Sequence, residues 1–183
     1  YRDVSRPADK ELFQKFNLRY DMVVIHPKML GEEFIKTLGH YHPLVPGASI
    51  TYPEIYEVQY GQAHFLLQKT NGDISSVIVI EARAGDKVIM PPGYGHISIN
   101  PANDFLVMSN LVEANFTPIY QPMIDMKGGA YFELSSGFVV NNNYKQVPEL
   151  RMIKAPPLES FNLPKLPLYR AFITNPDKFN FLV

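Results

Sequence analysis

Candidate metal-binding side chains fall in three short stretches of the sequence. The run Gly39-His40-Tyr41-His42 contains two histidines two residues apart. If this run is extended, both imidazoles lie on one face, because side chains alternate along a strand. Two imidazoles on one face form half of a metal site, although such a pair alone is more often a packing or surface feature. Glu54 and His96 are the other candidates, and the joint spacing of the three stretches decides between these interpretations.

Composition limits which sites and partners are possible. Cysteine is absent, which excludes a disulfide framework, a thiolate zinc site, an iron–sulfur cluster and a cysteine nucleophile. The formal net charge is −1 and no block of lysine or arginine occurs, so we expect neither nucleic-acid nor membrane binding. Apolar runs such as Val77 to Ile80 are too short to span a bilayer. No signal-peptide pattern opens the chain, so we expect a cytoplasmic protein. The first residue is Tyr1 rather than Met, so we expect that this sequence is truncated upstream.

Short strands joined by rigid turns are the expected architecture. Sixteen prolines disfavour long helices, and 13% aromatic residues suit pleated, half-buried surfaces. Asn71-Gly72 between alternating hydrophobic runs is the strongest hairpin signal. Eight strands at this spacing favour a sandwich or barrel of the jelly-roll kind. We expect them at Met22–His26, Glu33–Thr37, Glu54–Tyr60, His64–Lys69, Val77–Glu81, Lys87–Met90, His96–Asn100 and Phe105–Leu111.

Two sequence motifs resemble those of the cupin superfamily. The first is Glu54-x6-Gly61, and the second is Gly85-x5-Pro91-x-Gly93-x2-His96-x3-Asn100, which matches position by position. The first motif departs in one way, because eleven residues separate His42 from Glu54 where most cupins have three or four. The sequence thus predicts an all-β, single-domain cupin jelly-roll barrel with short helical pieces and an extended proline-rich C-terminal tail.

Three segments follow from this resemblance and from the composition. Residues 1–20 form an N-terminal lead-in, in which Asp9 could cap a short helical turn. Residues 21–140 form the cupin β-barrel, and residues 128–140 contain a further hairpin. Residues 141–183, rich in proline, form an extended tail that packs on the barrel or on a partner subunit. Its aromatic residues are expected to be exposed, among them Phe161, Tyr169, Phe172 and Phe179–Phe181.

A narrower resemblance is to the cupin-type glucose-6-phosphate isomerases of archaea and some bacteria. Those enzymes carry a Thr-x-Gly-His-aromatic-His run, a Glu-x-Tyr on the next strand and a Leu-Leu-Gln on the strand after, and residues 37–42, 54–56 and 66–68 match each one. Beyond Leu111 a Tyr and a His that line the archaeal site lack clear counterparts, and Tyr120 is a candidate for one of them. The resemblance implies metal ligands at His40, His42, Glu54 and His96, substrate contacts at Thr37 and Tyr56, and a catalytic role for Glu54.

Two histidines and one glutamate are set aside as ligands. Glu57 lies only four positions before Gly61, whereas the cupin turn requires the spacing that Glu54 has. His26 sits beside Pro27 at a strand end and His64 lies in a hairpin strand, so both are interpreted as structural.

The implied function is metal-dependent interconversion of glucose 6-phosphate and fructose 6-phosphate, with one divalent ion per subunit. Fe, Mn, Zn and Ni all remain admissible, and either proton transfer by Glu54 or a hydride shift could move the hydrogen between C1 and C2. With no Walker-type loop, hydroxyls such as Thr37 and backbone amides would bind the phosphate. The alternatives are another metal-dependent cupin enzyme, such as a dioxygenase or a different sugar-phosphate isomerase or epimerase, and a non-catalytic sugar-binding cupin. The aromatic residues of the tail predict a homodimer, and the resemblance implies the same, because the resembling isomerases are dimers.

Overall fold

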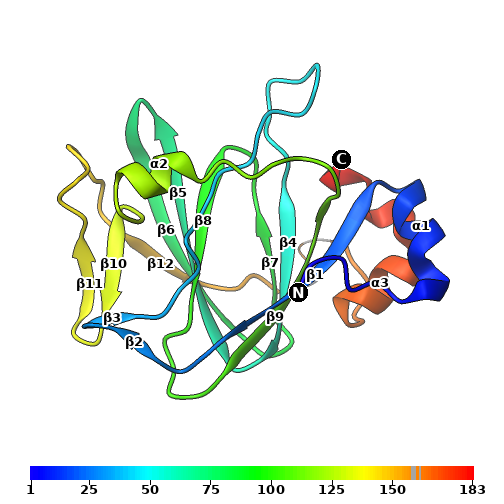
Figure 1. The fold of residues 1–183 in the computed structure, drawn as a ribbon, viewed down its shortest axis with the longest axis horizontal. Coiled ribbons are helices and arrows are strands. Elements are labelled where there is room, and N and C mark those ends of the chain that lie inside the picture. Colours follow the sequence, from blue (N-terminus) through cyan, green and yellow to red (C-terminus); the bar gives the residue numbers. More distant parts are fainter. Residues whose placement is uncertain (158–159, 161) are drawn as a thin grey trace.

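Two four-stranded sheets make the body of the molecule (Figure 1). The structure is a computed structural model that describes residues 1–157, 160 and 162–183. The first sheet has the order β1 (Leu18–Ile25), β9 (Leu106–Glu113), β4 (Glu54–Tyr60) and β7 (Lys87–Met90). The second has the order β12 (Arg151–Lys154), β6 (Asp73–Arg83), β5 (Gln62–Asn71) and β8 (Tyr94–Ile99).

Side chains from both sheets meet in one buried cluster. Tyr56 and Val58 of β4 and Met108 of β9 come from the first sheet, and Phe65 and Leu67 of β5 come from the second. Each strand contributes alternate residues, as expected for a barrel with a packed interior. The predicted all-β barrel is confirmed.

Turn chemistry in the sequence located the strands well. Strands β4 and β7 have the predicted bounds, and β1, β5, β6, β8 and β9 overlap their predicted segments, whereas β12 lies in the segment predicted to be a tail. At the predicted hairpin Asn71 pairs with Asp73, and Gly72 between them has a φ of +83°, a conformation that glycine adopts freely. Between β4 and β5, a Cβ on Gly61 would lie 2.3 Å from the carbonyl oxygen of Phe105, so the turn requires glycine there.

A small third sheet lies beside the barrel at the end away from the helices of the termini (Figure 1). It contains the predicted hairpin of β10 (Tyr131–Leu134) and β11 (Gly137–Val140). Short strands β3 (Glu33–Phe34) and β2 (Met29–Leu30) complete it, and helix α2 (Gln121–Asp125) precedes the hairpin.

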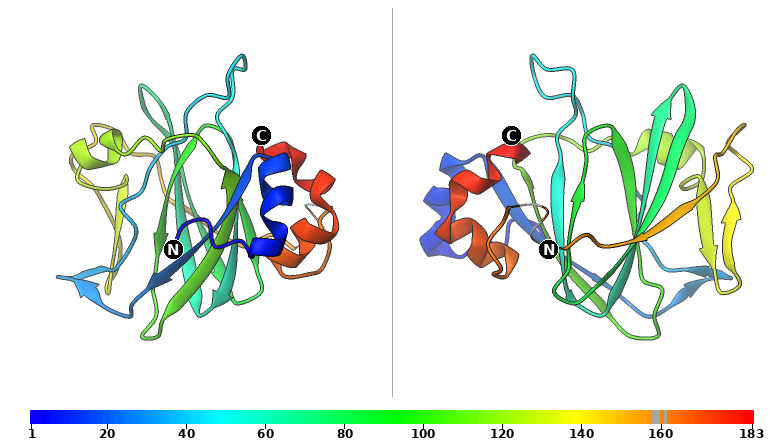
Figure 2. Two further views of the ribbon diagram at one scale, coloured as in Figure 1. Left: turned by 45° about the vertical axis from the view of Figure 1, so that its right-hand side comes forward. Right: turned by 180° about the vertical axis from the view of Figure 1, so that it is seen from behind.

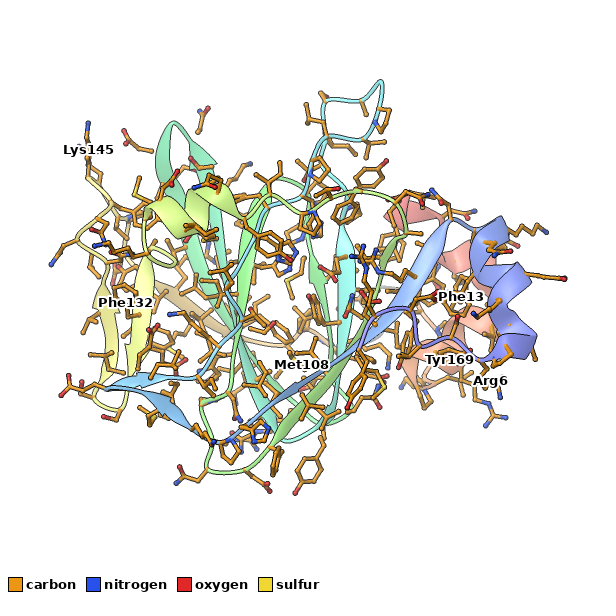
Figure 3. All side chains as sticks on the ribbon, in the orientation of Figure 1. Arg6, Phe13, Met108, Phe132, Lys145 and Tyr169 are labelled. Carbon is orange, nitrogen blue, oxygen red and sulfur yellow. The ribbon has the colours of Figure 1, made fainter. Side chains whose placement is uncertain are left out.

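The two ends of the chain build a helical layer on the outer face of the first sheet (Figure 2). The N-terminal part contributes η1 (Pro7–Asp9) and α1 (Lys10–Lys15), and the C-terminal part contributes α3 (Leu168–Thr174) and η3 (Pro176–Leu182). The rings of Phe13 and Phe172 meet at 4.6 Å, and Figure 3 shows Phe13 and Tyr169 together in this layer. None of the helices in the described residues is long and apolar enough to cross a membrane.

The prediction of an extended C-terminal tail needs correction. Strand β12 pairs in parallel with β6, and the chain then forms the helices α3 and η3. Phe172 and Phe179, predicted to be exposed, are fully buried. Phe161 lies outside the described residues. Prolines stop long helices but are tolerated in a first helical turn, and Pro167 and Pro176 stand where α3 and η3 start.

Candidate metal centre

The four predicted ligands converge at one point of the barrel. Each of the four side chains offers one ligand atom, and these atoms all lie within 4.8 Å of one another. The residues are His40, His42, Glu54 and His96. The Nε2 atoms of His40 and His42 are 3.1 Å apart. Glu54 Oε2 lies 3.4 Å from His42 Nε2 and 3.2 Å from His96 Nε2. The expectation that His40 and His42 share a face therefore holds.

Backbone pairing between distant segments creates this convergence. His40 and His96 form an antiparallel bridge, with the N–H of each bonded to the carbonyl of the other at 3.2 and 3.0 Å. Gly39 has a φ of +82°, and a Cβ there would lie 2.5 Å from Cγ1 of Ile97. Glycine thus lets the chain approach β8 closely and turn so that both histidines face the interior.

Burial sets the charge state of the cluster. Burial, aided by the nearby His96, lowers the pKa of His40 to about 3. The pKa of His96 is also lowered, chiefly by burial. For Glu54, burial alone would raise the pKa, but its contacts with His42 and His96 outweigh burial and the net direction is down. Two neutral imidazoles beside an ionised carboxylate are in the forms that coordinate a cation.

Two residues hold ligands in place that the sequence did not point out. Asn110 on β9 donates a hydrogen bond from Nδ2 to Glu54 Oε1 at 2.6 Å. His42 Nδ1 lies 2.8 Å from the carbonyl oxygen of Tyr52, which leaves Nε2 for the cluster. Such outer contacts fix the orientation of metal ligands. Finding them required the strand pairing of β9 with β4 and the path of the loop between His42 and Glu54.

Several ligand atoms of the cluster lack a hydrogen-bond partner, and a bound cation would supply one. Glu54 Oε2 and both ring nitrogens of His96 are buried and have no hydrogen-bond partner among the described residues. Buried polar atoms are normally paired, and an unpaired one calls for an explanation. A divalent ion held by three imidazoles and one carboxylate accounts for Glu54 Oε2 and one His96 nitrogen, so the residues present fit a metal.

The cluster opens into a cavity of about 650 Å³. Thr37 and Tyr56, the two predicted substrate contacts, line it. Thr37 Oγ1 accepts a hydrogen bond from the Ser98 N–H at 3.0 Å. Burial, then the charge of Glu54, raises the pKa of Tyr56 well above its usual value, so its phenol stays a donor. Tyr120 also lines the cavity, its ring 5.3 Å from that of His40.

The three residues that the sequence analysis set aside as metal ligands have other partners. Glu57 forms a buried ion pair with Lys87 at 2.8 Å. His64 Nδ1 lies 2.7 Å from Glu133, and the ring of His26 packs against Phe105. None of the three residues lines the cavity.

Comparison with known proteins identifies a family whose model matches this chain. The family model described as glucose-6-phosphate isomerase matches residues 1–149. Glucose-6-phosphate isomerase of Thermococcus litoralis is 30% identical over 99 residues, which cover 54% of this chain and 48% of the relative. That of Pyrococcus furiosus is 31% identical over 84 residues, covering 46% and 40%. Putative glucose-6-phosphate isomerase 2 of Rhizobium meliloti is 33% identical over 85 residues, covering 46% and 38%.

These curated relatives are longer than the matched region, which spans less than half the length of each. Among solved structures, an oxalate oxidase in complex with the substrate analogue glycolate has a TM-score of 0.47 at 17% identity, covering 60% of this chain and 49% of that one. The family match covers most of the chain and contains all four residues of the cluster. The chain therefore belongs to the glucose-6-phosphate isomerase family.

Proposed function

We propose that this protein is a metal-dependent isomerase that interconverts glucose 6-phosphate and fructose 6-phosphate. The observation that carries the proposal is the cluster of His40, His42, Glu54 and His96 in the lining of a cavity, in a chain of this family. The cavity volume, about 650 Å³, is within the range of small-molecule sites. The proposed cofactor is one divalent ion per subunit, drawn from Fe, Mn, Zn and Ni.

The residues around the cavity have separate tasks in this proposal. A divalent ion held by the cluster would polarise the sugar carbonyl as a Lewis acid. Glu54, held by Asn110, takes a proton from one of the carbons C1 and C2 and returns it to the other, while the hydroxyl proton passes between O1 and O2 in the same direction. The carbonyl thus moves from one carbon to the other with no net redox change. Tyr56 donates its phenol hydrogen to a sugar oxygen. Thr37 donates its hydroxyl hydrogen to the substrate, because its oxygen already accepts a hydrogen bond from the Ser98 N–H.

A coupled assay with metal-stripped protein tests this function. Activity from fructose 6-phosphate to glucose 6-phosphate is expected to disappear after EDTA treatment and to return when Mn, Fe, Ni or Zn is added back. Metal binding without isomerisation by any metal would contradict the proposal. Oxygen consumption by the iron-loaded protein would then favour a dioxygenase, and sugar binding without turnover would favour a non-catalytic cupin.

We propose further that the chain forms a homodimer, supported by the exposed edge strand β12. All four residues of β12 are exposed, and Met152 and Ile153 retain 48% and 40% of their accessible surface. Light scattering after size exclusion is expected to give twice the chain mass of 20.8 kDa. Ile153→Lys should shift the mass to one chain, because a charge on an edge strand opposes pairing. Val139→Lys, on the exposed edge of the small sheet, should leave the dimer intact. A single-chain mass for the unaltered protein would contradict the proposal.

A further inference from the structure

One largely buried arginine, Arg19, lines the same cavity as the metal cluster. Arg2 and Arg19 are the lysine or arginine residues among the described residues that line it. Arg2 lies at the start of the chain and is exposed, whereas the side chain of Arg19 keeps only 11% of its accessible surface. A guanidinium group in such a place has lost most of its water, so its interaction with an anion is stronger than at the surface.

Strand pairing fixes the position of Arg19 relative to the cluster. On β1, Leu18 and Tyr20 pack into the helical layer, so Arg19 and Asp21 face the barrel. Asp21 lies opposite Asn110 on β9, and Asn110 lies opposite Tyr56 on β4. Arg19 is therefore two strands away from the strand that carries Glu54, roughly 10 Å at the usual spacing between strands.

Neighbouring groups hold the guanidinium in one orientation. Arg19 Nε donates to both carboxylate oxygens of Asp21, at 3.0 and 2.8 Å. Arg19 Nη1 donates to the carbonyl oxygen of Ala114 at 2.9 Å. Nη2 has no acceptor among the residues that the structure describes. Arginine offers five N–H donors in a planar fork, so donors remain on both terminal nitrogens after these contacts are made.

We propose that Arg19 binds the phosphate group of the sugar phosphate, at the end of the cavity away from the metal cluster. This inference rests on the proposed function, and it replaces the expectation that hydroxyls and backbone amides alone bind the phosphate. Carbons C3 to C6 separate C1 and C2 from the phosphate, which matches a cation placed across the cavity from Glu54. The planar fork suits two phosphate oxygens, and Asp21 keeps it oriented before the substrate arrives.

Binding of a non-reacting ligand tests this site without relying on turnover. The probes are sorbitol 6-phosphate and sorbitol, with Kd measured by calorimetry on metal-loaded protein. The unaltered protein should prefer the phosphorylated ligand. Arg19→Gln should raise the Kd of sorbitol 6-phosphate by about 10-fold to 100-fold, as expected for a lost hydrogen bond to a charged group. The Kd of sorbitol should stay unchanged.

Arg6→Gln is the matched control. Arg6 also donates from Nε to an acidic side chain, Asp9, but it lies at the outer end of the helical layer (Figure 3). This variant should keep the preference of the unaltered protein. Because Arg19 also ties β1 to Ala114, Arg19→Lys serves as a second variant in case Arg19→Gln does not fold. Lysine keeps the charge without the fork, so its preference should fall by about 10-fold.

The outcomes separate this inference from the proposed function. An unaltered preference in a folded Arg19 variant overturns the inference, even if the protein isomerises glucose 6-phosphate. The inference is equally overturned if the unaltered protein does not distinguish the two probes. If the preference is lost with Arg19 while no metal restores isomerisation, the phosphate site stands and the proposed reaction falls.

Discussion

Replacing His96 with alanine is expected to lower kcat/KM by at least about 10³-fold, because a lost Lewis acid removes several kcal/mol of transition-state stabilisation. His96 Nε2 faces Glu54 Oε2 at 3.2 Å, and the His96 side chain is buried in the barrel wall. Alanine leaves three ligands and a gap that water must fill. The measurements are the metal content per chain, by mass spectrometry, and kcat/KM in the coupled assay. Both should fall together.

Two further variants make this result specific. His26→Ala removes an imidazole that packs on Phe105 outside the cavity, so metal content and kcat/KM should stay near those of the unaltered protein. Glu54→Gln keeps an oxygen near the ion but removes the proposed base, so kcat should fall more than metal content does. Full activity of His96→Ala without bound metal would rule out the metal-dependent mechanism.

The barrel could be predicted from the sequence because its signals are local. Turn residues such as Asn71-Gly72 and the alternation within β4 set strand ends to within a few residues. The helical layer could not be predicted in this way. Phe172 and Phe179 are buried because α1, from the other end of the chain, covers them together with β1 and β9. Nothing near these phenylalanines in sequence indicates that contact, so proline content alone suggested an extended tail.

The candidate site also contains both residues that could be predicted from the sequence and residues that could not. The shared face of His40 and His42 could be predicted from their spacing, and Glu54 and His96 were implied as further ligands by the resemblance of the two motifs to those of a known family. Asn110 and Arg19 could not, because each acts across strands whose pairing only the fold reveals. Asn110 lay within a predicted strand, and a polar residue on the inward face of that strand was the one signal available. Arg19 fell in the segment interpreted as an N-terminal lead-in, although β1 starts at Leu18.

Replacing Lys87 with methionine is expected to destabilise the protein by about 3–5 kcal/mol, the usual cost of breaking a buried ion pair. Lys87 Nζ donates to Glu57 Oε1 at 2.8 Å, and the two side chains keep only 2% and 5% of their accessible surface. The other oxygen of Glu57 accepts from the backbone N–H of Leu168 at 2.8 Å, at the start of α3. Without Lys87 the glutamate charge stays buried with neutral donors only. Urea unfolding measures the loss.

The second variant separates charge from packing. Glu57→Gln in the Lys87→Met background keeps an oxygen for the Leu168 N–H but removes the unpaired charge, so much of the lost stability should return. Arg6→Ala, which breaks an exposed ion pair with Asp9, should change the unfolding midpoint little. A free energy of unfolding for Lys87→Met within about 1 kcal/mol of the unaltered protein would show that the pair does not hold the helical layer to β4.

The kcat/KM of the Lys87→Met variant tests whether the two faces of β4 have separate functions. Glu54 and Tyr56 line the cavity, whereas Ile55 packs into the helical layer and Glu57 bonds to the first residue of α3. Alternation along one strand thus places the chemistry on one side and the attachment of the C-terminal helices on the other. Well below its unfolding midpoint, the variant should therefore keep the kcat/KM of the unaltered protein, because no group in the cavity has changed.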